Sequence, residues 1–206
     1  MLSVAKASET TGTALDVVSR SLKPGHVYRR EDLARVSNAV DRHLRELVSA
    51  GQLKKLAQGL YYAPRQSVFG SLPPEDAELV RGFLRDRHFL VFSPSAYNTV
   101  GLGTTQLYNR TVVYNHKRHG VFMLGNRQFD FRVKPRFPEA LTAEFLFVDM
   151  LNNLDALAED VGAVWQRVAA KVHDFQPTLL QEAVMQYGKA AVRKKLEDLL
   201  HVSAAA

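Results

Sequence analysis

The feature that most constrains the fold is an amphipathic segment, residues 38–50, followed at once by a short hairpin. Its apolar residues recur at the i, i+4, i+7, i+8 spacing of a single helix face. They are Val40, Leu44, Leu47 and Val48. Ser37 precedes this predicted helix as a capping residue, and Gly51 follows it as a stop signal. The apolar pieces of residues 53–62 come next, and Gly59 between them can supply the positive φ that a tight turn needs.

Two shorter helices are predicted upstream, at about 12–21 and 30–36, and the hairpin strands at 53–56 and 60–62. The first 66 residues therefore follow the order helix, helix, helix, hairpin. This order predicts a winged helix-turn-helix, in which the third helix enters the DNA major groove and the hairpin lies on an adjacent phosphate strand. The alternative is a solvated amphipathic helix in an unrelated small bundle.

The predicted DNA-facing side chains of the third helix are polar residues that can read base edges. They fall within about 40° of the pole opposite the apolar face, and Arg suits guanine as Asn suits adenine. They are Asn38, Arg42, Arg45 and Ser49, with Ser37 at the helix start. Phosphate contacts are predicted at Lys54, Lys55 and Gln58 of the hairpin and at Arg29 and Arg30 at the start of the second helix. Asp41 and Glu46 dilute the positive charge of this face.

For residues 67–206 we predict a second, mixed α/β domain with a small sheet and C-terminal helices. A stretch rich in Gly, Ser and Pro, residues 67–74, follows a first domain of residues 1–66. Strands are predicted at 89–92, 111–114, 121–124 and 128–134. Helices are predicted at 74–87, 94–100, 142–151, 160–173 and 177–200. Ser93 and Thr142 are predicted to cap the second and third of these helices, and Gly125-Asn126 is a turn signal between the last two strands. The predicted fold class is therefore α+β.

Composition and charge further restrict the kind of protein that the chain can be. The 206 residues include no cysteine, which excludes disulfides, thiolate metal sites and a Cys nucleophile. Residues 1–66 and 67–136 each carry a net charge of +5, whereas residues 137–206 carry −4. The basic front predicts a polyanionic partner, although a net charge of this size is also common on ordinary solvated surfaces. No apolar stretch is long enough for a bilayer span, and the N-terminus lacks an apolar signal region, so we expect a soluble, cytoplasmic protein.

A basic tetrapeptide in the second domain invites a metal or catalytic interpretation. Two histidines at i, i+3 in a hairpin could ligate zinc, but no third ligand lies at a suitable spacing. We interpret the tetrapeptide as a phosphate-contacting or partner-facing surface, formed by His116, Lys117, Arg118 and His119. Gly101-x-Gly103 lacks the third glycine of a dinucleotide fingerprint, and no Walker or kinase motif occurs. The sequence therefore predicts no catalytic residue, no metal site and no cofactor.

Two segments carry recognisable motifs. Residues 44–64 read LRELVSAGQLKKLAQGLYYAP and contain a G-x-Y signature at Gly59–Tyr61, and residues 93–138 contain GLGTTQ at 101–106. Together they resemble the AbiEi-type antitoxin family of type IV toxin–antitoxin systems, over roughly residues 10–155. The resemblance implies an N-terminal winged helix that binds inverted repeats in its own promoter and represses the operon. It also implies a remainder that counteracts a co-transcribed nucleotidyltransferase-like toxin, without requiring a stable complex.

The resemblance makes Thr104, Thr105 and Gln106 candidates for toxin neutralisation, while the simplest alternative is a turn that caps neighbouring backbone groups. Two other functions stay open. The chain could be a winged-helix regulator whose α/β half senses a small ligand, which a deep pocket with convergent polar groups would favour. Residues 67–206 could also modify the toxin or a nucleotide, although no phosphate-binding motif supports this.

Overall fold

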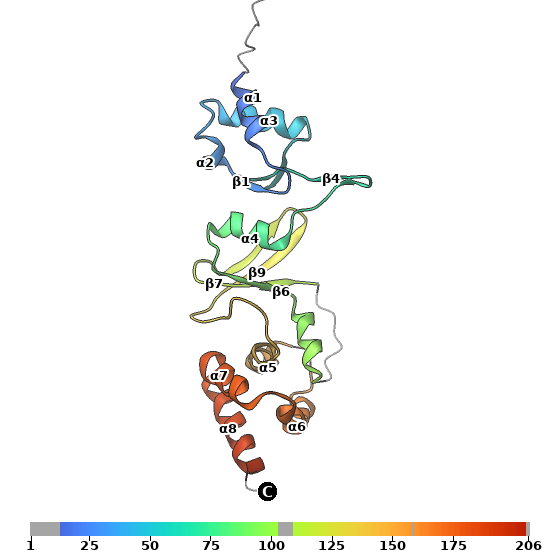
Figure 1. Ribbon diagram of the computed structural model, residues 1–206, viewed down its shortest axis with the longest axis vertical. Coiled ribbons are helices and arrows are strands. Elements are labelled where there is room, and N and C mark those ends of the chain that lie inside the picture. Colours follow the sequence, from blue (N-terminus) through green and yellow to red (C-terminus); the bar gives the residue numbers. More distant parts are fainter. Residues whose placement is uncertain (1–12, 103–108, 158, 205–206) are drawn as a thin grey trace, which may run out of the picture. The chain divides into compact units, whose positions relative to one another are not determined.

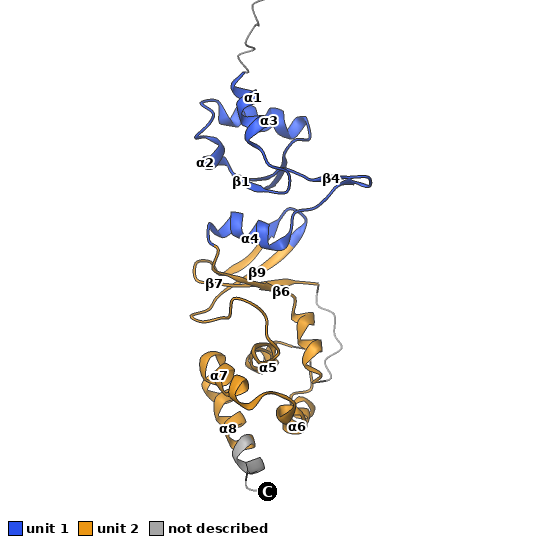
Figure 2. Cartoon of the chain, in the orientation of Figure 1, with its two compact units in different colours: residues 1–86, 123–127 blue, residues 87–122, 128–206 orange. Residues whose placement is uncertain are grey.

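The computed structural model describes residues 13–102, 109–157 and 159–204, and its mixture of helices and small sheets is the predicted α+β class (Figure 1). The chain divides into two compact units, the first of residues 1–86 with 123–127 and the second of residues 87–122 with 128–206 (Figure 2). The first unit thus runs past the boundary predicted at residue 66. Within the described residues, no helix has the length and apolarity needed to cross a membrane.

The first unit begins with the three predicted helices, all shorter than expected. They are α1 (Ala14–Ser21), α2 (Arg30–Leu33) and α3 (Val40–Ser49). Thr13 and Asp16 form a capping box, in which each side chain accepts a hydrogen bond from the other residue's backbone N–H, so α1 starts two residues later than predicted. Buried apolar residues of α1, α2 and α3 pack into one cluster with the strands that follow. This cluster contains Val18, Leu33, Val40, Leu44, Leu47, Leu53 and Ala63.

A three-stranded antiparallel sheet completes the cluster, with the order β1-β3-β2. Its strands are β1 (Val27–Arg29), β2 (Lys54–Ala57) and β3 (Leu60–Tyr62). The two predicted hairpin strands are confirmed, with β2 shifted by one residue. The strand β1 was not predicted, because three residues are too few to show the alternation of apolar and polar residues that marks a strand. Its pairing with β3, for example Val27 opposite Tyr62, holds it in the sheet.

The segment after β3 also belongs to the first unit. It contains a two-stranded hairpin, β4 (Gln66–Ser67) and β5 (Gly70–Ser71), and the helix α4 (Asp76–Leu84). Pro74 was predicted as the first helical residue, but Glu75 is the N-cap and Pro74 lies before it. The Pro74 carbonyl accepts a hydrogen bond from Arg127 instead of a helical N–H, which accounts for the later start.

Close contacts join α4 to β1. A Cβ atom added to Gly82 would lie 2.5 Å from Cγ1 of Val27, so the absence of a side chain lets the helix approach the strand. The guanidinium of Arg29 donates hydrogen bonds to the carbonyl oxygens of Gly82 and Phe83 near the end of α4. These contacts explain why α4 groups with the first unit.

The second unit is built on a four-stranded sheet of order β6-β7-β9-β8. Its strands are β6 (Leu90–Phe92), β7 (Thr111–Asn115), β8 (Gly120–Leu124) and β9 (Arg127–Val133), all within one residue of prediction. The β8–β9 turn contains Gly125 at a φ of 63°, as its turn signal predicts. However, β7 pairs with β9 in parallel, so β7 and β8 are not neighbours. The prediction that His116–His119 form a hairpin is therefore wrong, since they lie in a crossover loop.

Helices pack around α5 (Ala143–Asn152), which is buried along most of its length, and Figure 1 shows them grouped around it. Thr142 caps α5 and Ser93 caps η1, as predicted, each accepting a hydrogen bond from a backbone N–H of its helix. The surrounding elements are η1 (Pro94–Val100), η2 (Leu154–Ala156), α6 (Val161–Lys171), η3 (Val172–Asp174), α7 (Pro177–Tyr187) and α8 (Ala190–Ala204).

The last predicted helix, 177–200, is in fact two helices, because the backbone becomes extended at Gly188. The side chain of Asn152 binds both sides of this break. Its Nδ2 donates to the carbonyl of Tyr187, and its Oδ1 accepts from the N–H of Lys189. Asn152 thus satisfies backbone groups that a continuous helix would have paired internally.

Candidate nucleic-acid interface

Helix α3 has one buried face and one exposed face. Val40, His43, Leu44 and Leu47 are buried. Val48, which was predicted on the core face, is 37% exposed, so that prediction is wrong. At about 100° per residue, Val48 lies about 80° around the helix from Val40, at the flank of the apolar face rather than at its centre. The buried face anchors α3 in the apolar cluster and leaves the opposite face to solvent.

The turn before α3 is organised by Ser37. We predicted that Ser37 caps the helix and contacts DNA, but the N-cap is Ala39 and carries no side-chain cap. Ser37 is 7% exposed, its Oγ lies 2.7 Å from Nδ1 of His43, and it accepts a hydrogen bond from the N–H of Ala39. A buried hydroxyl held in this way cannot reach a base edge, so Ser37 positions α3 rather than touching a ligand.

An exposed ion pair fixes the first turn of α3 to α2. Arg30 donates two hydrogen bonds to the Asp41 carboxylate, with Nε 2.7 Å from Oδ1. This bond holds the pKa of Asp41 below its ordinary value and raises the pKa of Arg30. The negative charge also lies at the N-terminus of the helix, where the helix dipole favours it. Arg30, predicted as a phosphate contact, is thus engaged with Asp41 in the free protein.

The remaining predicted readers lie on the exposed face of α3, except Asn38, which precedes the N-cap Ala39 and so lies outside the helix that was predicted to contain it. All four are exposed: Asn38, Arg42, Arg45 and Ser49. Nε of Arg42 lies 3.6 Å from a carboxylate oxygen of Glu46, and Nε of Arg45 donates to the backbone carbonyl of Asp41. Exposed pairs of this kind contribute little stability, typically about 0.2–1 kcal/mol, so they can exchange for a stronger anionic partner.

The hairpin after α3 presents the predicted phosphate contacts. Lys54, Lys55 and Gln58 are all exposed. Gly59 has a φ of 66°, which permits the tight turn between β2 and β3. The register shifts between Lys55 and Ala57, so the strand bends just beyond the two lysines. The two ammonium groups are therefore available on a short, irregular strand.

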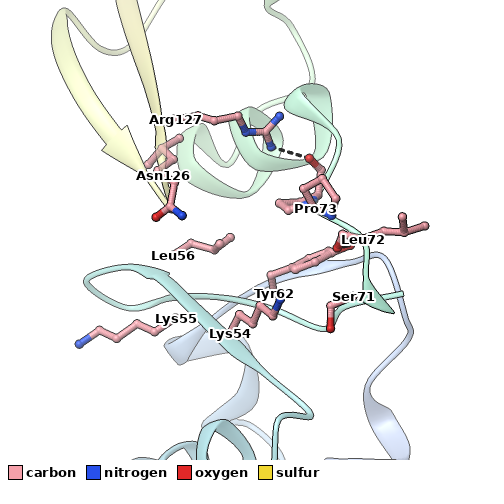
Figure 3. A pocket seen from close by; sticks show the side chains of 12 residues that line it. Lys54, Lys55, Leu56, Tyr62, Ser71, Leu72, Pro73, Asn126 and Arg127 are labelled. Atoms are coloured by element: carbon pink, nitrogen blue, oxygen red, sulfur yellow. Dashed lines mark hydrogen bonds between the residues drawn. The ribbon is translucent and has the colours of Figure 1, made fainter. Parts of the chain in front are cut away.

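A hollow of about 290 Å³ lies beside this strand within the first unit. Its walls come from β2, the segment of Leu72 and Pro73, and the turn at 124–127, and the N–H of Gly125 donates to the carbonyl of Leu56. Figure 3 shows Leu56 inside the hollow and the ammonium of Lys55 pointing away from it (Figure 3). The hydrogen bond from Gly125 thus supports β2 from one side, while Lys55 lines the hollow with its ammonium group directed away from it.

Arg29, the other predicted phosphate contact, has a structural role. Its guanidinium is bonded to the carbonyl oxygens of Gly82 and Phe83 and lies over the Phe83 ring, 5.9 Å from its centroid. An arginine that is bound to the end of α4 in this way is not presented to a phosphate. The prediction missed this because α4 lies more than 50 residues away in the sequence.

The basic tetrapeptide of the second unit is exposed at all four positions. Asn115, which the sequence analysis overlooked, closes this loop. It is 1% exposed, its Oδ1 accepts from the N–H groups of Lys117 and Arg118, and its Nδ2 donates to the carbonyl of Arg118. An Asn one residue before a basic run is the signal for such an Asx turn.

The first histidine of this loop stacks on two other rings. The His116 ring centroid lies 5.0 Å from that of His88 and 4.8 Å from that of Phe137. Over residues 13–102, 109–157 and 159–204, no group of three or more His, Asp or Glu side chains is arranged to hold a metal ion. The other predicted partner residues, Thr104, Thr105 and Gln106, lie outside the described residues.

Comparison with known proteins gives a likeness of fold. The sequence matches no protein-family model and no curated protein. The structure is similar to the crystal structure of the RV2827C protein from Mycobacterium tuberculosis, with a TM-score of 0.55 and 16% sequence identity. The match covers 91% of this chain and 74% of that chain. At this identity, the similarity concerns the fold alone.

Proposed function

We propose that the chain is a sequence-specific DNA-binding protein whose first unit is a winged helix-turn-helix. The observation that carries the proposal is the exposed face of α3, with Arg42 and Arg45, followed directly by a hairpin with Lys54 and Lys55. The element order α1, β1, α2, α3, β2, β3 and the sheet order β1-β3-β2 support this assignment. In it, α3 is the recognition helix and the β2–β3 hairpin is the wing.

The roles of the side chains follow from their chemistry. Arg42 and Arg45 would bind O6 and N7 of guanine with two hydrogen bonds each, and Asn38 would read adenine. Lys54, Lys55 and Gln58 would contact phosphate oxygens, which fixes the position of α3 without reading sequence. Arg30 would contact a phosphate oxygen only if its ion pair with Asp41 were broken. Ser37 and Arg29 are left out of the contact set, because both are held within the first unit.

We further propose that the protein acts as an AbiEi-type antitoxin in the cytoplasm and has no enzymatic activity of its own. The motifs at 44–64 and 93–138 support this part of the proposal. The protein would repress its own operon through inverted repeats, and it would counteract a co-transcribed nucleotidyltransferase-like toxin. The exposed loop of His116 to His119 would face that partner.

Two experiments test the two parts separately. In the first, fluorescence anisotropy compares the full chain on the DNA upstream of its own gene and on a shuffled duplex of equal length. We expect tighter binding to the upstream DNA, and equal affinities would reject sequence-specific binding. In the second, the neighbouring reading frame is expressed with and without this chain. Growth arrest that this chain relieves is expected, and arrest that it does not relieve would reject the antitoxin role.

A further inference from the structure

A cavity of about 520 Å³ lies wholly within the second unit and is distinct from the DNA-contact residues. It is formed by the end of β7, the residues after β9, α5 and the break between α7 and α8. These segments lie far apart in the sequence, from Tyr114 to Arg193. A cavity of this size falls in the range that proteins use for small organic ligands.

The lining of the cavity is strongly basic. It contains four cationic side chains, those of Lys134, Arg136, Lys189 and Arg193, and one carboxylate, that of Asp149. Two tyrosine hydroxyls already donate to this carboxylate: Tyr97 at 2.7 Å, and Tyr114 at 2.8 Å from Oδ2. The Lys134 ammonium lies 3.9 Å from Asp149, at the outer limit of an ion pair. The cavity therefore holds an excess of positive charge.

Two of the cations are held in place by neutral carbonyl groups. The ammonium of Lys189 donates to the backbone carbonyl of Asn152, and Nε of Arg193 donates to the carbonyl of Gly188. Carbonyl acceptors fix the position of a cation without neutralising it. Among the described residues, no hydrogen-bond partner is found for the two terminal nitrogens of the Arg193 guanidinium, and such a pair of N–H donors suits two oxygens of a phosphate group.

Lys134 is a partly buried cation of this lining. Burial, together with the neighbouring positive charges of Lys189 and Arg132, lowers the pKa of its ammonium despite the nearby Asp149. Its Nζ atom also lies 4.8 Å from the centroid of the Tyr114 ring. A bound anion would lower the electrostatic cost of bringing these cations together.

Apolar and aromatic side chains also line the cavity, beside the polar Asn152 and Gln186. Phe145, Met185 and Tyr187 line the cavity, and the Phe145 and Tyr187 rings meet edge to face at 5.2 Å. Phe145 is itself only 2% exposed, so the accessible part of this wall belongs to Met185, which is 52% exposed, and to the partly buried Tyr187. A free inorganic anion would leave this surface uncovered, whereas the organic part of a phosphate ester would bury it. The combination of a basic end and an aromatic wall is that of a site for an organic phosphate.

We propose that this cavity binds the phosphate group of a small phosphomonoester, with Arg136 and Arg193 as the principal phosphate ligands and the side chains of Met185 and Tyr187 against its organic part. The proposal goes beyond DNA binding and does not depend on it, because every residue involved belongs to the second unit. The second unit would then bind a ligand whose negative charge matches the basic lining of the cavity.

Isothermal titration calorimetry of the full chain tests the proposal with adenosine monophosphate, adenosine and inorganic phosphate. We expect adenosine monophosphate to bind, inorganic phosphate to bind more weakly and adenosine not to bind. Because a hydrogen bond between charged groups is lost, Arg193→Gln should weaken binding about tenfold or more. Arg136→Gln, at an exposed position, should do the same. Lys194→Gln, at an exposed position of the same helix α8, is the matched control and should leave binding unchanged.

Three results of the titrations would overturn the proposal. They are no binding of adenosine monophosphate, equal binding of adenosine and its monophosphate, and equal affinities of wild type and both arginine variants that retain the wild-type melting temperature. A loss of DNA affinity in these variants without any small-phosphate binding would also overturn it, since the cavity would then be a contact surface for the DNA backbone.

Discussion

The hydroxyl of Ser37 and the Nδ1 atom of His43 lie 2.7 Å apart in a buried contact that joins the turn before α3 to the helix itself. The other ring nitrogen of His43 lies 3.4 Å from a guanidinium nitrogen of Arg42, a residue of the exposed face. One buried histidine therefore links the position of α3 in the core to the orientation of a proposed base reader.

Ser37→Ala should destabilise the fold. The substitution leaves a nitrogen of His43 buried without its partner, which costs about 1–3 kcal/mol. Ser49→Ala, at the exposed end of α3, is the matched control and should change stability by no more than about 0.5 kcal/mol. Urea unfolding followed by circular dichroism measures both. Equal stability of the two variants would show that the Ser37–His43 contact does not support the fold.

Gly82→Ala should also be destabilising, although alanine favours a helix over glycine by about 1 kcal/mol. The new methyl group would lie 2.5 Å from Cγ1 of Val27, and overpacking of this kind costs about 1–3 kcal/mol. In a Val27→Ala background Cγ1 is gone and the nearest remaining atom, Cβ of residue 27, lies 3.1 Å from the new methyl group, so the same change should cost clearly less than in wild type. A Gly82→Ala protein more stable than wild type would contradict the close approach of α4 and β1.

The two tyrosines bonded to Asp149 should make the fold sensitive to alkali. Burial, followed by the charge of Asp149, raises the pKa of both Tyr97 and Tyr114. The folded chain then keeps two protons that the unfolded chain releases above its ordinary tyrosine pKa of about 10. Their stabilising contribution is complete below pH 10 and is lost as pH rises, by up to about 1.4 kcal/mol per pH unit for each tyrosine.

Urea unfolding between pH 8 and 11.5 measures this dependence. Tyr97→Phe and Tyr114→Phe should each be less stable at pH 8, because a hydrogen bond to Asp149 is lost, and each should show a shallower decline above pH 10. Burial lowers the pKa of Lys134, so this residue makes the stability rise with pH, opposite to the tyrosines. Because Lys134 is present in wild type and in both variants, it does not affect the comparison of their slopes. Identical slopes in wild type and both variants would contradict the buried cluster.

The parts of the fold that the sequence predicted are those with local signals. Thr142 and Ser93 announce their helices by capping, and the alternation of Phe129, Phe131 and Val133 marks β9, although Val133 itself is 49% exposed. Neither signal needs information from a distant part of the chain.

The parts that were not predicted depend on contacts between distant residues. The strand β1 exists through its pairing with β3, and the break at Gly188 is stabilised by Asn152. Likewise, Arg29 is bound to the end of α4, and the basic cavity draws Lys134 and Arg193 together from separate elements. Periodicity and turn chemistry report on neighbours in the chain, so they carry no information about such pairs.

The two lysines of β2 should contribute affinity without specificity. Lys54→Ala and Lys55→Ala should each weaken binding to all DNA sequences alike, and each should lower the slope of log affinity against log salt by about 1. Anisotropy titrations over a range of salt concentrations measure the slope. Lys194→Ala in the second unit is the matched control and should leave the slope unchanged. A lysine variant with the wild-type slope would remove that residue from the phosphate contacts.

The most direct test of the central claim, that α3 reads DNA sequence, is the ratio of affinities for the upstream and shuffled duplexes, measured at one salt concentration. Wild type should prefer the upstream duplex. Arg42→Ala or Arg45→Ala should lose about 1–3 kcal/mol on that duplex, with little change on the shuffled one, so the ratio falls. A wild-type ratio of one, or an unchanged ratio in both arginine variants, would contradict the claim.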